Sequence, residues 1–251
     1  MTKAISLIVA SLLSVPLGIA ATLAHAGCAF EPQGEGHVVE IVDGKTLRLS
    51  DGREIRLAGI EPAASSRAAL STIIAGRDVT LRGNDDVPDR YGRQTAFVFL
   101  SSSDPPIQAQ LLAEGAALVL PEIADKSCSA LLLAAEAEAR GAKRGIWNSP
   151  SVIKNAEIPE DILAGIGRLT VVEGKVLSVR QAGTTTYVNF GRNFTRDFAV
   201  TISRRMMPAV ESAGVTLKSL ENRRIRVRGW VEARPGPRIE VHQTGQIEVL
   251  D

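Results

Sequence analysis

Short stretches in which hydrophobic and polar residues alternate run through residues 37–120, and glycine-containing turns separate the first of them. Alternation with a period of two is typical of strands that bury one face. Asp43-Gly44 and Asp51-Gly52 are turn signals between such stretches. The pattern therefore predicts a meander of short strands, followed by more widely spaced ones. The strands are expected at residues 37–41, 46–50, 54–57, 78–82, 95–100 and 116–120.

Hydrophobic residues at helical spacing interrupt this strand pattern. They predict helices at residues 65–75, 107–115 and 131–143, of which the last could be capped by Ser127 or Ser129. Short strands with helices inserted late are typical of a five-stranded oligonucleotide-binding (OB) barrel with appended helices. We therefore expect a mainly β, α+β fold, with such a barrel as a first domain at residues 27–148.

A second group of strands follows residues 149–165, a stretch that contains two prolines and no clear periodicity. We interpret that stretch as an inter-domain linker. Five strands are again expected beyond it, so the prediction for residues 166–251 is a second small OB-like β-barrel. The predicted strands are 169–179, 185–190, 197–202, 223–232 and 238–241, with a helical turn near 206–213.

Residues 1–26 have the composition of a signal peptide. One charge at Lys3 precedes an apolar stretch that Pro16 interrupts, and residues 24–26 fit the small-x-small cleavage rule. We expect cleavage after Ala26 and a periplasmic or secreted protein. The alternative is an uncleaved membrane anchor, because the apolar stretch is nearly long enough to span a bilayer. No later segment is apolar for long enough, so no membrane span is expected after cleavage.

The two cysteines, Cys28 and Cys128, could pair in an oxidising compartment. A bridge between them would close a loop of about 100 residues, which corresponds to about 4 to 5 kcal/mol in the chain-entropy model. The sequence leaves open whether they pair or stay free.

Charge divides unevenly along the chain. Residues 27–150 hold 13 Lys and Arg against 17 Asp and Glu, whereas residues 151–251 hold 15 against 11. The basic second half suits a polyanionic partner, although a solvated surface of mixed charge is the common explanation for so small an excess.

Four segments occur in the order and approximate spacing of one enzyme family. They are VDGKTLRLSDGREIRLAGIEPA, DRYGRQTAFVFL, IQAQLLAEGAALV and LLLAAEAEARGAKRGIW, all within residues 36–148. In this register the chain resembles the staphylococcal (thermo)nuclease family. The resemblance implies a nuclease in which two carboxylates hold Ca²⁺, a glutamate acts as general base and two arginines bind the scissile phosphate.

Carried over to this chain, the phosphate-binding arginines are Arg56 and Arg93. Asp43 keeps the first carboxylate of the family's turn and Thr46 its hydroxyl, while Glu61 takes the place of the strand-end aspartate. The resemblance thus implies Arg56, Arg93 and Glu61 as catalytic positions, with Asp43 and Glu61 as the remaining metal ligands.

Two positions depart from the family pattern. Lys45 replaces the second carboxylate of the turn, and an ammonium group cannot coordinate Ca²⁺. The position of the general base falls on Ala64, or on Ala63 if Pro62 follows a one-residue deletion. Loss of a general base alone costs about 10² to 10⁴ in rate. We therefore expect an inactive or weak calcium nuclease without a cofactor, and Ca²⁺ only if the site functions.

The retained arginines have two explanations. In the first, Lys45 supplies the positive charge of the missing metal, and with Arg56 and Arg93 it grips a phosphate without cleaving it. In the second, the arginines pair with Glu61, Asp89 or Asp43 as surface salt bridges and stabilise the mouth of the barrel.

Arginines and aromatic residues interleave in the second half, which resembles small OB barrels fused to nuclease-like domains. Bases stack on aromatic rings while guanidinium groups bind phosphates, so this composition suits a single strand. Since alternate strand positions face opposite ways, Arg224, Arg226 and Arg228 are expected to form a basic stripe. The alternative is that the aromatic residues fill the barrel. The candidate nucleic-acid-binding residues are Tyr187, Arg192, Arg196, Arg224, Arg226, Arg228 and Trp230.

The sequence therefore predicts an exported two-domain protein that binds single-stranded DNA or RNA, or another polyanion, without efficient hydrolysis. Two other functions fit the same residues. The first is a weak metal-dependent phosphodiesterase that uses Asp43, Glu61, Arg56 and Arg93, and the second is an envelope scaffold that binds protein. The oligomeric state is not predicted.

Overall fold

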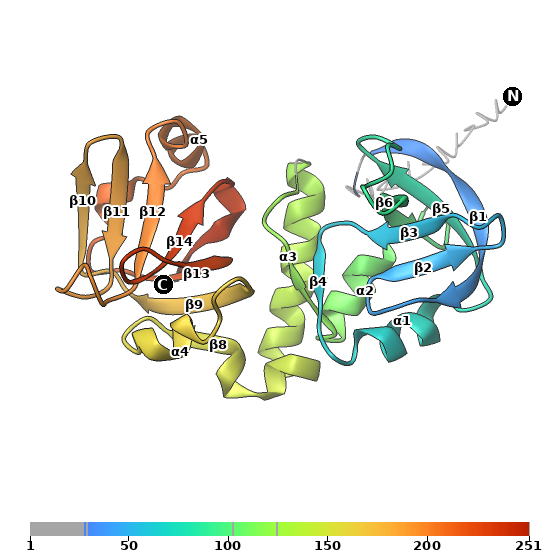
Figure 1. Ribbon diagram of the computed structural model, residues 1–251, viewed down its shortest axis with the longest axis horizontal. Helices are drawn as coiled ribbons and strands as arrows, with labels where there is room; N and C mark the ends of the chain where they lie inside the picture. The colour runs from blue at the N-terminus through green and yellow to red at the C-terminus, as the bar shows by residue number, and fades with distance from the viewer. Residues whose placement is uncertain (1–27, 29, 102, 124, 251) are drawn as a thin grey trace, which may run out of the picture.

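Two β-rich regions make up the molecule, and a long helix, α3 (Lys126–Gly141), lies between them (Figure 1). The computed structural model describes residues 28, 30–101, 103–123 and 125–250. The predicted signal peptide and its cleavage point lie outside these residues. Across the described ranges, none of the helices combines the length and the hydrophobicity that crossing a bilayer requires.

The first region contains a closed barrel of five strands in the order β1-β2-β3-β6-β5, as expected. Burial alternates along most of these strands, so that one side chain in two packs into the barrel. The first strand pairs with both β2 and β5, and irregular register along it lets it turn between the two. The barrel strands are β1 (Glu31–Ile41), β2 (Thr46–Leu49), β3 (Glu54–Leu57), β5 (Asp78–Gly83) and β6 (Arg93–Phe99).

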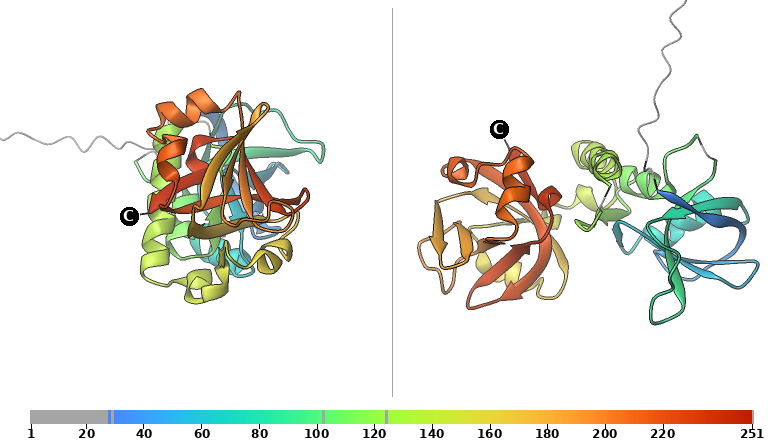
Figure 2. Two further views of the ribbon diagram at one scale, coloured as in Figure 1. Left: turned by 90° about the vertical axis from the view of Figure 1, so that its left-hand side faces the viewer. Right: turned by 90° about the horizontal axis from the view of Figure 1, so that it is seen from above.

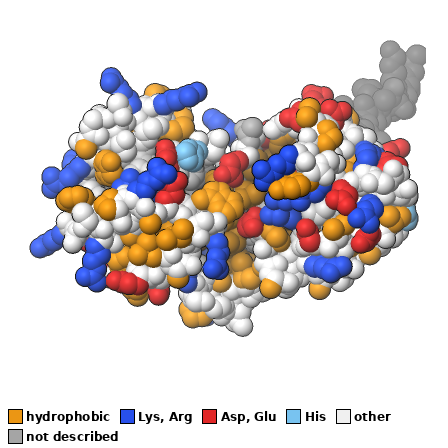
Figure 3. All heavy atoms as spheres, viewed as in Figure 1, with side chains coloured by type: hydrophobic (Ala, Val, Ile, Leu, Met, Phe, Trp, Pro, Cys, Tyr) orange, Lys and Arg blue, Asp and Glu red, His pale blue; other side chains and the backbone are white. Residues whose placement is uncertain are grey.

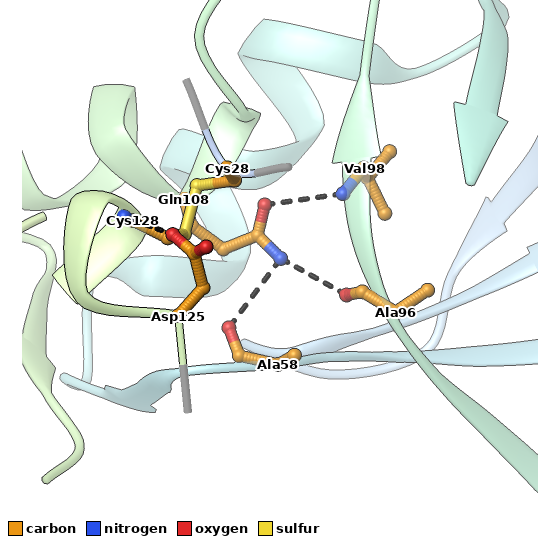
Figure 4. Close-up of a disulfide and its surroundings, with 7 residues drawn as sticks. All are labelled: Cys28, Ala58, Ala96, Val98, Gln108, Asp125 and Cys128. Carbon is orange, nitrogen blue, oxygen red and sulfur yellow. Dashed lines mark hydrogen bonds between the residues drawn. A yellow bond between two sulfur atoms is a disulfide. The ribbon is translucent and has the colours of Figure 1, made fainter. Parts of the chain in front are cut away.

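Two further helices belong to this region, α1 (Ser66–Ile74) and α2 (Ile107–Ala113). The fully buried side chain of Gln108 holds α2 against the barrel (Figure 4). Its amide donates to the carbonyl groups of Ala58 and Ala96 and accepts from the amide of Val98. A buried amide with all these partners specifies one position of the helix.

The third helix begins earlier than predicted and has a different cap. It starts at Lys126, and its cap is Asp125, whose carboxylate accepts from the amide of Cys128 at 2.6 Å. Ser127 and Ser129, the expected caps, lie inside the helix. An aspartate in the extended conformation before the first turn satisfies a free amide, which the serines no longer can from within.

Cys28 and Cys128 form a disulfide, the alternative that the sequence left open (Figure 4). Both residues are buried. The bridge joins the start of the described chain to the first turn of α3, while the neighbouring Phe30 stacks on Phe97 of β6 with ring centroids 4.4 Å apart. The start of the chain is therefore fastened both covalently and by packing.

Two short strands leave the barrel and pair with each other, β4 (Ile60–Pro62) and β7 (Ala117–Val119). Their register places Glu61 opposite Leu118. This small sheet carries the end of the barrel toward the second region.

The stretch expected to be a linker, residues 149–165, is folded. It contains a short strand, β8 (Ile153–Asn155), which pairs in parallel with β9, and a short helix, α4 (Pro159–Leu163). Pro159 occupies the first turn of α4, where a residue without a free amide is tolerated. Through β8 the stretch thus contributes an edge strand to the second sheet.

The second region is a mixed sheet in the order β10-β11-β12-β14-β13-β9-β8, with β15 also paired to β13. It is not closed within the described residues, which corrects the expectation of a second barrel. The long strand β13 pairs with β9 on one side and with both β14 and β15 on the other, so the sheet divides instead of closing. Its remaining elements are β9 (Leu169–Lys175), β10 (Ser178–Ala182), β11 (Thr185–Asn189), β12 (Ala199–Ser203), α5 (Met207–Ser212), β13 (Arg224–Ala233), β14 (Pro237–Val241) and β15 (Ile247–Leu250).

A buried ion pair joins the two regions. Arg228 of β13 is 3% exposed, and its guanidinium donates to both carboxylate oxygens of Glu136 in α3, at 2.9 and 2.7 Å. Glu136 is fully buried and also accepts from the amide of Val119 in β7 at 2.8 Å. Arg140 of α3 extends the network to Glu248 of β15. Two parallel charged hydrogen bonds fix both distance and orientation.

Removal of Cys28 and Cys128 together, each replaced by alanine, is expected to lower the free energy of unfolding by up to about 4 kcal/mol, because the unfolded chain regains the freedom of a long loop. Chemical denaturation with and without reductant measures this. Reductant should lower the denaturation midpoint of the parent and leave the variant unchanged; a parent that ignores reductant would contradict the bridge.

Replacement of Arg228 by Met is expected to destabilise the chain by up to about 3 to 5 kcal/mol, because the buried Glu136 carboxylate loses its doubly hydrogen-bonded partner and keeps only the longer contact with Arg140. The double variant Glu136→Gln, Arg228→Met removes both charges and keeps an oxygen for Val119, so it should be more stable than Arg228→Met alone.

The matched control for this prediction is Arg196→Met, which breaks an exposed pair with Glu160. It should change the free energy of unfolding by less than about 1 kcal/mol. Equal effects of Arg196→Met and Arg228→Met in urea denaturation would show that the buried pair does not stabilise the interface.

Candidate functional site

The turn between β1 and β2 carries Asp43, Gly44 and Lys45. The Asp43 carboxylate accepts from the amide of Lys45 at 2.8 Å, and the amides of Val42 and Asp43 both donate to the carbonyl of Thr46. Gly44 packs closely against β4 and the start of α1, because a Cβ there would lie 3.0 Å from the Cβ of Pro62 and 3.1 Å from that of Ser66. Its carbonyl accepts from the hydroxyl of Ser66 at 2.5 Å. The turn is therefore held in one position.

This turn directs Lys45 at Glu61. The Lys45 Nζ donates to Glu61 Oε2 at 2.7 Å, and the side chains are only 14% and 32% exposed. Lys45 also accepts through its carbonyl from the amide of Leu57, which anchors its backbone to β3. The carboxylate expected to bind a metal is therefore paired with an ammonium group of the same chain.

Arg56 lies next to this pair on β3, opposite Thr46 of β2 and Thr95 of β6. It is half-buried and lines a pocket of about 280 Å³ together with Phe97 and Glu122. Within the described ranges, its guanidinium has no hydrogen bond or ion pair. Of the predicted phosphate-binding groups, Arg56 is thus free to take a ligand.

Arg93, at the start of β6, is engaged by Asp89. Its Nε and Nη2 donate to Asp89 Oδ2 at 3.0 and 2.7 Å, while Asp89 Oδ1 accepts from the amides of Tyr91 and Arg93. These hydrogen bonds, chiefly those from the Arg93 side chain, lower the pKa of Asp89 to about 2. The exposed ring of Tyr91 lies under the guanidinium of Arg93. The salt-bridge explanation therefore describes Arg93 in this structure.

Asp43 lies close enough to Arg93 to act on it. The hydrogen bonds that Arg93 donates to Asp89 raise the pKa of Arg93, and the negative charge of Asp43 adds to this effect. The structure thus brings Asp43, Lys45, Glu61 and Arg93 into one neighbourhood, as the resemblance implies, but with their charges already matched.

These residues do not fit a calcium ion. Calcium takes six to eight oxygen ligands, usually with several carboxylates. In the described part of the chain no three or more His, Cys, Asp or Glu side chains gather where an ion could be held. Glu61, one of the two expected ligands, instead accepts from Lys45.

The positions at which a general base is expected face the second region. Ala63 and Ala64 line a cleft of about 450 Å³ with Glu61, Leu118 and, from β13, Trp230. Hydrophobic side chains gather between the two regions on the face shown in Figure 3. Methyl groups at both positions leave this cleft without a carboxylate beyond that of Glu61 among its lining residues.

The three arginines of β13 share one face, as the period of the strand predicts, but that face carries its own counter-ions. Arg224 lies 4.0 Å from Glu173, and Arg226 contacts both Glu173 and Glu248 at 2.6 Å. Arg228 is buried against Glu136. Arg228 is therefore not accessible to a nucleic acid in this arrangement, and the stripe is neutralised along its length.

The other candidates of the second region lie apart. Trp230 is 43% exposed and faces the inter-domain cleft, and Arg196 pairs with Glu160 at 3.1 Å. Tyr187 of β11 lies on the outer face of the sheet, and Arg192 is exposed on the loop that follows β11. The structure does not gather the seven candidates into one surface.

Glu136 and Arg238 are the residues that sequence reasoning missed. Glu136 lies on the buried face of α3 with Leu132 and Ala139. A charged residue on the apolar face of a predicted helix is the sequence signal that could have indicated a buried ion pair there. Arg238 lies over the ring of Tyr187, with its guanidinium carbon 5.8 Å from the ring centroid. No local pattern marks that contact, because it joins two strands far apart in the chain.

Comparison with known protein families supports the resemblance to staphylococcal nuclease in the first region. Residues 55–149 match the family described as staphylococcal nuclease homologue. The chain thus contains a domain similar to staphylococcal nuclease. The matched residues include Arg56, Glu61 and Arg93, whereas Asp43 and Lys45 precede them on the same barrel. The match does not extend into the second sheet. No curated protein matches the chain.

The Asp89 carboxylate gives a prediction for acid stability. Because its pKa is lowered to about 2 from an ordinary value of 3.8, it stabilises the fold above about pH 4, and this contribution disappears as pH falls through 2. Asp89→Asn should lower the melting temperature at pH 7, and the difference from the parent should shrink between pH 4 and pH 2. Asp86→Asn, at an exposed neighbour, is the matched control; a similar loss there would contradict a specific role for Asp89.

Proposed function

We propose that this protein binds nucleic acid or another phosphate polymer outside the cytoplasm and does not hydrolyse it efficiently. One observation carries the proposal: Lys45 Nζ lies 2.7 Å from Glu61 Oε2. The ammonium group of Lys45 thus pairs with Glu61, the carboxylate that the resemblance assigns to the metal. It supplies positive charge to the site without Lewis-acid chemistry.

The missing base supports the same conclusion. With alanine at residues 63 and 64, the site has no carboxylate to take a proton from an attacking water at either expected position. Loss of a general base and loss of electrostatic stabilisation by a metal each reduce rates by orders of magnitude. Both losses fall in one small neighbourhood of this chain.

Binding is supported by groups that have kept positive charge without an internal partner. Arg56 lines a pocket beside the Lys45–Glu61 pair and has no ion pair within the described ranges. The similarity of residues 55–149 to staphylococcal nuclease implies nucleic acid as the ligand class. A guanidinium group suits phosphate because it donates two parallel hydrogen bonds.

Export is supported by the disulfide between Cys28 and Cys128, since such bridges form and persist mainly in oxidising compartments. It agrees with the signal peptide expected at residues 1–26, so the partner is a polymer met in the periplasm or outside the cell.

The experiment measures cleavage of single-stranded DNA by the chain from Gly27 onward, with Ca²⁺ and with chelator. The parent is compared with two double variants, Lys45→Asp with Ala64→Glu and Lys45→Asp with Ala63→Glu, because the base position has two alignments. We expect no chelator-sensitive cleavage by the parent and calcium-dependent cleavage by one of the variants.

A matched control adds Arg56→Ala to whichever variant is active, which should reduce its rate by about 10² or more, because the arginine then stabilises the transition state. Chelator-sensitive cleavage by the parent would overturn the proposal and favour the weak phosphodiesterase. Absence of any salt-dependent affinity of the parent for DNA, RNA or polyphosphate would favour a protein-binding scaffold instead.

A further inference from the structure

The loop between β11 and β12 presents one aromatic ring to solvent. Its flanking residues Phe190 and Phe198 are buried and pack on each other, with ring centroids 5.1 Å apart. Phe194, between them, is 76% exposed. The two buried rings anchor the ends of the loop in the core, so the exposed ring is not needed for packing.

Hydrogen bonds hold this loop in shape. The amide of Asn193 donates to the carboxylate of Asp197 at 2.8 Å, and the Asn193 side chain accepts from both the amide and the hydroxyl of Thr195. A Cβ on Gly191 would collide with the Asp197 carboxylate, so the close approach of these residues requires glycine there. The ring of Phe194 is thus displayed by a structured loop, which lowers the entropy lost on binding.

The exposed ring borders a pocket of about 630 Å³. The pocket lies between this loop and the hairpin of β10 and β11, and its polar lining includes Arg180, Asn189 and Arg192. Ser178 and Asn189 also line the pocket, and they are directly paired across the hairpin and joined by a side-chain hydrogen bond of 3.3 Å. The pocket therefore combines an aromatic wall with amide, hydroxyl and guanidinium groups.

The two arginines of this pocket keep their charge available. Both are exposed, and within the described residues neither guanidinium forms a hydrogen bond or ion pair. The carboxylate that Arg180 acts on is Glu221, whose pKa is lowered mainly by a hydrogen bond from Lys218 and then by the amide of Val179. This contrasts with the arginines of β13, whose charges are matched by glutamates.

Aromatic and arginine side chains also lie together along the outer face of the sheet beyond the pocket. Arg180 is paired directly across from Tyr187, and the guanidinium of Arg238 lies over the Tyr187 ring. β10 is the edge strand of the sheet, and the hairpin lies at the end of the molecule away from the nuclease-like barrel in two views (Figures 1 and 2). Lys and Arg side chains project along the margin of this region in Figure 3.

We propose that this pocket binds single-stranded nucleic acid, with one base stacked on Phe194 and the adjoining phosphates held by Arg192 and Arg180. A single strand offers both a π-face and a phosphate at each nucleotide, which is the combination that the pocket matches. A duplex hides its bases, so it would leave the ring without a partner. This inference rests on the proposed function and names its binding site.

The experiment measures the affinity of the chain from Gly27 onward for a fluorescently labelled oligothymidylate of about 12 nucleotides, a length within the usual range of such sites. Anisotropy titrations are made at several salt concentrations. Phe194→Ala should weaken binding about tenfold with an unchanged salt slope, because stacking is lost and phosphate contacts remain.

The double variant Arg180→Ala, Arg192→Ala should weaken binding and reduce the slope of log affinity against log salt by about 1.4, since each lost phosphate contact removes about 0.7 on a single strand. Arg77→Ala is the control for loss of positive charge elsewhere, because it removes one charge at an exposed arginine of the first region. It should bind as the parent does. Melting temperatures within experimental error of the parent confirm that each variant is folded.

The outcomes separate the two proposals. If the parent shows no salt-dependent binding to the oligonucleotide, the proposed function fails together with this site. If the parent binds and neither Phe194→Ala nor the double arginine variant changes the affinity, the proposed function stands and this site is overturned. If the arginine variant weakens binding while Phe194→Ala does not, the pocket takes a polyanion and the single-strand inference is overturned.

Discussion

The buried carboxylate of Glu136 is the group on which the arrangement of the two regions depends. It accepts from Arg228 of β13 and from the amide of Val119 in β7, so one side chain holds an element of each region against α3. β7 pairs with β4, and β4 carries Glu61. The position of Glu61 at the candidate site is therefore linked through two strands to the contact between the regions. Trp230 lies two residues beyond Arg228 on the same face of β13. Because Arg228 fixes this strand against α3, Trp230 also lines the cleft beside Glu61.

The charges of the molecule separate into two groups with different consequences. In the nuclease-like domain, Lys45 is paired with Glu61 and Arg93 with Asp89, so most of the inherited site is neutralised internally. On the outer hairpin of the second region, Arg180 and Arg192 lie exposed beside an exposed ring. A surface whose charges are unmatched attracts a polyanion at longer range than one whose charges cancel. The binding site that we propose on the outer hairpin therefore lies apart from the barrel site at which the resemblance would place catalysis.

The barrel was predictable because its strands alternate in burial, and alternation is a local property of the sequence. Arg56, Arg93 and the defect at Lys45 could also be located from short motifs. The burial of Arg228 could not be predicted, because the period of a strand indicates which face a residue lies on but not what covers that face. Its partner is 92 residues away. That the second sheet stays open could not be predicted from a local pattern either, because it depends on β13 pairing with three strands. The strand β8 is too short to give a clear period.

The bridge between Cys28 and Cys128 limits when the first region can reach its final, covalently linked state. It joins residues 100 positions apart, so in the export that we propose it can form only after roughly the first half of the chain has entered the oxidising compartment. Before that moment the first turn of α3 is not tied to the barrel, and α3 is the helix that presents Glu136 to the second region. If the chain is exported as we propose, translocation therefore sets the earliest time at which α3, the helix that carries Glu136, is tied covalently to the start of the barrel region.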